Sequence, residues 1–207
     1  MKRIVLIRHA EAIKNLQNQH GGEGTKLTIK GREQSISFAK EIGKKYSFER
    51  VLYAAKPQCL ETAEIIAHIL NIPKVDSTVF NPISLGVLDG LSDSEVAEAY
   101  PSLNLKMQKW REGSIEICDL IIPNMEDKDS FYKRGEKMLS SILDTRESQI
   151  LILTRSLLVL LTSILLKRNT SKGGNYREIK WRNLDYAIFS FEQNEVFYHI
   201  SASTIRI

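Results

Sequence analysis

An arginine and a histidine stand side by side near the start of the chain, directly after a short apolar run. Arg8 and His9 follow Ile4-Val5-Leu6-Ile7, a β-branched run without alternation that is typical of a strand buried on both faces. Ligands of parallel sheets bind beyond the carboxyl ends of the strands. A guanidinium beside an imidazole at that position can hold a phosphate group and attack it. His9 is therefore a candidate nucleophile and Arg8 a candidate phosphate ligand.

A second arginine follows another strong strand signal. The run from Gln149 to Thr154 predicts a buried strand, and Arg155 comes next, before a helix that we expect over Ser156 to Lys167. A helix N-terminus adds partial positive charge to such a position. The sequence therefore predicts an anion site at which Arg8, His9 and Arg155 converge.

The other elements must bring these strand ends together. Strands are expected over 51–54 and 75–80, helices over 28–46, 60–70, 105–110 and 130–143, a capping box at Ser92–Glu95, and a hairpin over 186–192 and 195–200 that turns at Gln193-Asn194. This alternation predicts an α/β three-layer sandwich. Its central sheet is mostly parallel, helices cover both faces, and the C-terminal hairpin is antiparallel. We expect a single domain over 1–207 with a helical insertion at about 92–125.

Composition restricts the partners. The chain has 207 residues, 43% hydrophobic and 26% charged, and a net charge of +4, so it can fold without a disulfide or a metal. The charge mildly favours anionic ligands but is too dispersed to predict nucleic-acid binding. The most apolar stretch, 150–166, is interrupted by Arg155, so no membrane span is predicted.

Further features bear on compartment and cofactors. No secretory signal is visible, and Cys59 and Cys118 lack metal-type spacing, which favours buried thiols in a cytoplasmic protein. The absence of a metal-ligand cluster and of a nucleotide-binding glycine fingerprint predicts neither metal nor cofactor. His68 and His199 are interpreted as structural, and His20 as a solvated loop residue.

An ordered series of motifs resembles the histidine phosphatase superfamily, which includes the phosphoglycerate mutases. The matching positions are Arg8-His9-Ala10 for its RHG signature, then Glu11, Asn15, Leu27–Gly31 with Gln34, Glu61–Ile66, Leu85–Ser92, Glu126, Arg134 and Asn183. The resemblance spans essentially the whole chain. It implies that His9 attacks phosphorus and becomes a phosphohistidine, with Arg8 as the first phosphate clamp. We also expect Asn15 and Gln58 among the phosphate-binding residues.

Several positions depart from the family pattern. Gln58 stands where the second arginine is expected, Pro82 where the acid is expected, and Arg155 where the second histidine is expected; Ala54 replaces a serine, and Gln19 a basic residue. Glutamine supplies one neutral amide in place of a charged guanidinium with two parallel donors, and proline cannot donate a proton. Arg155 restores the formal charge that position 58 lacks.

These departures leave three hypotheses. The preferred one is a catalytically impaired or inactive protein that binds inorganic phosphate, a small phosphorylated molecule or, in addition, a protein partner. The second is an active phosphomonoester hydrolase that works through His9, with Glu11 or Asp89 as the acid. The third, a phosphoglycerate mutase, ranks last because a mutase needs more positive charge in its pocket than these residues supply.

Overall fold

A six-stranded mixed sheet forms the centre of the computed structural model, which describes residues 1–171, 175–192, 195–200 and 204–205. The strand order is β3-β2-β4-β1-β6-β7. Neighbours among β1, β2, β3 and β4 are parallel, whereas β6 and β7 run antiparallel. The strands are β1 (Lys2–Arg8), β2 (Arg50–Ala54), β3 (Lys74–Ser77), β4 (Gln149–Leu153), β6 (Tyr186–Glu192) and β7 (Glu195–Ile200). The predicted three-layer α/β fold is confirmed.

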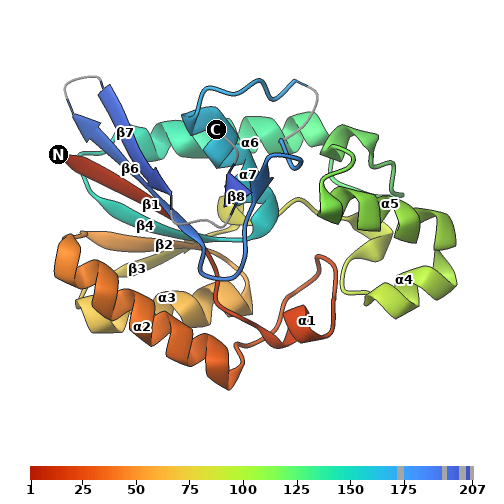
Figure 1. The fold of residues 1–207 in the computed structure, drawn as a ribbon, viewed down its shortest axis with the longest axis horizontal. Helices are drawn as coiled ribbons and strands as arrows, with labels where there is room; N and C mark the ends of the chain where they lie inside the picture. Colours follow the sequence, from red (N-terminus) through yellow and green to blue (C-terminus); the bar gives the residue numbers. More distant parts are fainter. Residues whose placement is uncertain (172–174, 193–194, 201–203, 206–207) are drawn as a thin grey trace.

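Helices cover both faces of this sheet. Figure 1 shows α2 and α3 against one face and α6 and α7 against the other, with α4 and α5 beyond the end to which β1 runs. The helices are α1 (Ile13–Leu16), α2 (Ile29–Lys45), α3 (Pro57–Leu70), α4 (Asp93–Ala99), α5 (Pro101–Glu112), α6 (Lys128–Leu143) and α7 (Arg155–Leu165). A small separate pair, β5 (Ile179–Lys180) and β8 (Thr204–Ile205), is antiparallel and was not predicted.

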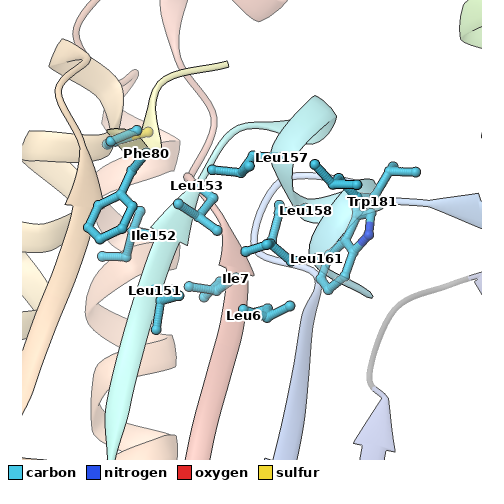
Figure 2. Packing of buried hydrophobic residues seen from close by; sticks show 14 of the residues in the cluster. Leu6, Ile7, Phe80, Leu151, Ile152, Leu153, Leu157, Leu158, Leu161 and Trp181 are labelled. Carbon is cyan, nitrogen blue, oxygen red and sulfur yellow. The ribbon is translucent and has the colours of Figure 1, made fainter. Parts of the chain in front are cut away.

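The core explains why the strand ends are rigid. The apolar run Ile4–Ile7 and all five residues of β4 are buried, as expected of strands covered on both faces. Figure 2 shows Leu157, Leu158 and Leu161 of α7 packed over these two strands. Because close-packed side chains resist displacement, the residues that directly follow β1 and β4 have fixed positions.

Some predicted boundaries were wrong for identifiable reasons. The third strand ends at Ser77, where the serine side chain accepts from the amide of Val79 and starts a 3-10 turn over Thr78–Phe80. Helix α3 begins at Pro57 rather than at residue 60, since proline suits a first helical turn. Helix α5 likewise begins at a proline and is longer than predicted.

Two further expectations concern the cysteines and membrane-spanning helices. Cys59 is buried as predicted, but Cys118 is exposed, and the two thiols are not joined by a disulfide. Among the described residues, none of the helices has the length and apolar character that crossing a membrane requires.

Candidate active site

A cavity of about 180 Å³ opens where β1, β2 and β4 end. The structure brings Arg8, His9 and Arg155 to its lining, as strand topology predicted, and adds Asn15 from α1 and Gln58 from α3. These side chains come from segments up to 147 residues apart, and the parallel pairing of β1 with β4 brings their ends together.

His9 is held in one orientation. Its Nδ1 lies 2.8 Å from the carbonyl oxygen of Ala10. A carbonyl can only accept, so Nδ1 carries the proton and Nε2 keeps the free electron pair. Burial and then the charge of Arg8 lower the pKa of His9 to about 3, although the Ala10 carbonyl acts in the opposite direction. The ring, 3% exposed, is therefore neutral at physiological pH.

Arg8 is anchored at one nitrogen and unpartnered at another. One terminal nitrogen donates to the carbonyl of Trp181 at 2.8 Å. Its Nε is buried and has no hydrogen-bond partner within the described chain. Burial and the nearby Arg155 lower the pKa of Arg8 to about 10, so it still carries its charge near neutrality.

Arg155 starts α7 and reaches over a buried aromatic ring. One terminal nitrogen donates to the carbonyl of Arg111 at 2.9 Å, and the guanidinium carbon lies 5.8 Å from the ring centre of Tyr176. Thr154, the residue that precedes the helix, makes no side-chain cap. The side chain of Thr154 therefore does not accept from the first backbone amides of α7. These amides lie next to the guanidinium of Arg155, which lines the cavity.

Gln58 and Asn15 are both tied to neighbouring loops. The Gln58 side chain, 2% exposed, accepts from the backbone amide of Thr25 at 3.2 Å, so the NH₂ group is the donor that remains to it. Asn15 Oδ1 accepts from the amide of Ala12 at 2.9 Å and from Asn183 at 3.2 Å. Asn15 thus fixes the turn after β1.

The two candidate acids do not line this cavity. Glu11 accepts from the Thr28 hydroxyl at 2.9 Å and from Lys30 at 3.1 Å, which braces the start of α2. Asp89 accepts from the amides of Gly22 and Leu85 and from the Ser84 hydroxyl. Both carboxylates therefore hold loops together, and the structure does not bring either of them to His9.

Four lining residues were missed or misinterpreted. Lys14, Lys56 and Arg111 add positive charge, and His20, expected to be solvated, is 6% exposed with Nε2 2.9 Å from Asp93 Oδ1. Lys56 follows β2 at the same sheet edge, so strand topology could have found it. Arg111 and His20 reach the cavity through loop and helix packing that leaves no local sequence signal.

Several lining residues carry buried polar atoms without a hydrogen-bond partner in the described part of the chain. They are Arg8 Nε, Trp110 Nε1, Arg111 Nε, Thr154 Oγ1 and Arg155 Nε. Buried donors normally have partners, and each unsatisfied one is costly. These unsatisfied atoms therefore lie within the walls of the cavity.

Comparison with known proteins agrees with this geometry. The sequence pattern of the histidine phosphatase superfamily (branch 1) matches residues 4–200. The chain belongs to that superfamily. The resemblance drawn from the RHG-like motif is thereby confirmed for the family, whereas the roles of the altered positions stay predictions.

Solved structures show the same fold. A mycobacterial glucosyl-3-phosphoglycerate phosphatase in complex with VO3 has a TM-score of 0.77 at 17% identity, with 100% of each chain covered. The complex of that phosphatase with inorganic phosphate gives 0.74 at 16%, covering 97% of this chain and 95% of the other. A putative alpha-ribazole-5'-P phosphatase from Escherichia coli gives 0.78 at 18%, covering 100% and 98%. At these identities the likeness establishes the fold.

Proposed function

We propose that this histidine phosphatase superfamily member binds a phosphate group, free or in a small phosphorylated molecule, against His9 and is impaired as a phosphatase. The observation that carries the proposal is the cavity lining. It holds five cationic side chains, of which Arg111 is paired with Asp93, and no carboxylate among the described residues. Such a lining favours a dianion through its charge.

His9 retains the features of a phosphoryl acceptor. With Nδ1 donating to Ala10, Nε2 is the nitrogen that can bond to phosphorus. The low pKa keeps that nitrogen unprotonated at neutral pH. Related solved structures hold vanadate or phosphate, which supports a phosphate-like ligand for this chain.

The proton for the leaving oxygen has no carboxyl source in the cavity lining. Pro82 lines the cavity but cannot donate, and Glu11 and Asp89 lie outside it. Of the other titratable lining groups, His20 contacts Asp93 and Lys14 donates to the carbonyl of Gly21, which leaves the ammonium group of Lys56. General acid catalysis is typically worth about 10²–10⁴ in rate. Esters of poorly acidic alcohols should therefore react very slowly.

A second candidate is an active phosphomonoester hydrolase with a rearranged site. The defined orientation of His9 favours it, because Nε2 is ready to attack. The cavity also holds more positive charge than the sequence indicated, through Lys14, Lys56 and Arg111. In this candidate the acid must come from a cavity residue, since neither Glu11 nor Asp89 is one.

The test combines binding and turnover. Calorimetric titration with inorganic phosphate should show binding that Arg8→Gln and Arg155→Gln each weaken by about 10–100-fold, the usual worth of a charge-assisted hydrogen bond. Arg146→Gln, which removes an equal charge at an exposed position, is the control. Absence of phosphate binding contradicts the proposal. Glycerol phosphate turnover that His9→Ala abolishes would establish the second candidate instead.

A further inference from the structure

One side of the same cavity is apolar. Ile83 and Leu85 come from the segment after β3, and Met107 and Trp110 come from α5; all four line the cavity and are at most 8% exposed. The cationic groups line the same cavity, and one of them, Arg111, directly follows Trp110 on α5. A ligand in this space therefore meets both positive charge and apolar surface.

Trp110 is a fixed indole with an unused donor. Its ring packs against Tyr176 with centroids 4.7 Å apart and an interplanar angle of 46°. Its Nε1 is buried and has no acceptor among the described residues. A tryptophan held in this way offers a ligand ring an aromatic contact.

The lining of the cavity favours some ligand groups over others. Its four buried apolar side chains suit a small apolar group next to the phosphate. The apolar wall also disfavours a polyhydroxy chain, whose hydroxyl groups would lose their hydration without partners.

We infer that the ligand class of this site is the phosphate monoester of an aromatic alcohol. The inference rests on the proposed function and adds the identity of the alcohol. It also fits the missing acid, because a phenol has a pKa of about 10 and its anion leaves without protonation far more readily than an alkoxide. The apolar wall and the lack of a carboxyl group in the lining thus favour the same chemical class independently.

The hydrolysis of an aryl phosphate at this site requires no acidic residue of the protein. Nε2 of His9 bonds to phosphorus as the bond from phosphorus to the aryl oxygen breaks, and the electron pair leaves on the phenolate, which water protonates. Water then attacks the phosphohistidine, the N–P bond breaks, and inorganic phosphate leaves with neutral His9 restored. The net reaction converts an aryl phosphate and water into a phenol and phosphate.

The experiment compares two esters on the intact protein. Calorimetric titration with phenyl phosphate and glycerol phosphate should show phenyl phosphate binding at least tenfold more tightly. Met107→Gln and Trp110→Leu should both reduce that preference to less than threefold, and Met107→Gln should leave the affinity for inorganic phosphate within twofold. Leu105→Gln is the matched control, since Leu105 lies on the same helix, is 55% exposed and does not line the cavity.

The outcomes separate the two proposals. Equal affinity for both esters, with phosphate still bound in an Arg8-dependent manner, overturns the inference and leaves the proposed function in place. Failure to bind any of the three anions overturns both. If the wall variants do not fold, the comparison of esters on the unaltered protein still decides.

Discussion

The side-chain nitrogen of Asn183 lies 2.9 Å from the carbonyl oxygen of His9 and 3.1 Å from that of Ala10. The two residues Asn183 and His9 are 174 positions apart in sequence. One amide therefore joins the segment before β6 to the turn that orients the imidazole. Since the Ala10 carbonyl also receives His9 Nδ1, Asn183 stabilises the very group that fixes the histidine tautomer.

Replacing Asn183 should loosen this turn. We expect Asn183→Ala to lower the free energy of unfolding by about 1–3 kcal/mol, because it leaves the His9 carbonyl without its side-chain donor and removes one of the two donors to the Ala10 carbonyl. Asn183→Asp, which has the same shape but no N–H group, should be at least as damaging. Urea denaturation measures the stability, and phosphate titration measures the effect on the site. Unchanged stability in both variants would contradict a role for this amide.

The low pKa of His9 predicts a loss of stability in acid. The folded-state pKa is about 3 against 6.5 for an unperturbed histidine, so the unfolded chain takes up a proton over this interval and the folded chain does not. The free energy of unfolding should thus fall as pH drops from about 6.5 towards 3, by at most about 1.4 kcal/mol per unit from this group. Urea denaturation at several pH values measures the slope.

The substitution His9→Gln should reduce that slope. The buried His20, whose pKa is also lowered, chiefly by its burial, contributes in the same direction and keeps part of it. His68→Gln, at an exposed position of α3, provides the control and should leave the slope in place. A slope identical in the His9 variant and the unaltered protein would refute the assignment of a neutral, buried imidazole.

Adding an acid should restore alkyl ester turnover. Pro82 lines the cavity, so Pro82→Glu places a carboxyl group there. We expect it to raise the rate of glycerol phosphate hydrolysis by about 10²-fold, the lower end of what general acids supply. Pro82→Gln is the matched control, equal in size but without a proton to give. An equal gain in both variants would show that removal of the ring, and not proton donation, limits the reaction.

A close backbone contact supports the turn after β1. A Cβ added at Gly31 would lie 2.1 Å from the carbonyl oxygen of Glu11. Gly31→Ala should therefore displace the segment that follows His9, cost about 1–3 kcal/mol, and weaken phosphate binding. Calorimetry and urea denaturation test the two effects.

Gly43 in the same helix provides the comparison. A Cβ there meets only the end of the Leu70 side chain, at 2.6 Å, which can move aside. Gly43→Ala should consequently be neutral or stabilising by up to about 1 kcal/mol, since alanine favours helix. If both glycine variants behaved alike, the contact with Glu11 would not be the cause.

The sequence predicted the parts of the site that strand topology determines. Arg8, His9 and Arg155 directly follow buried parallel strands, and such strands end at one edge, so their positions follow from the sheet alone. The motif also predicted the family. The same reasoning could not say which way a side chain turns, and Glu11 faces Thr28 and Lys30 although it lies two residues after His9.

Contacts made by the region between β3 and α6 were not predictable. Arg111 and Trp110 reach the cavity from α5, whose packing depends on long-range contacts such as those of Trp110 with Tyr176 and of Arg111 with Asp93. Local periodicity identifies α5 as a helix but does not orient it. The interpretation of His20 as solvated was wrong for the same reason, because its partner Asp93 lies 73 residues away in sequence.

The central place of β1 has a consequence for biosynthesis. Its two neighbours, β4 and β6, begin at residues 149 and 186, so the first apolar strand emerges from the ribosome long before either partner exists. A nascent chain in that interval carries an exposed, aggregation-prone Ile-Val-Leu-Ile segment, and both of its hydrogen-bonding edges are unpaired. Shielding by a chaperone during translation would suit this topology, and truncated translation products would be expected to aggregate through that same segment.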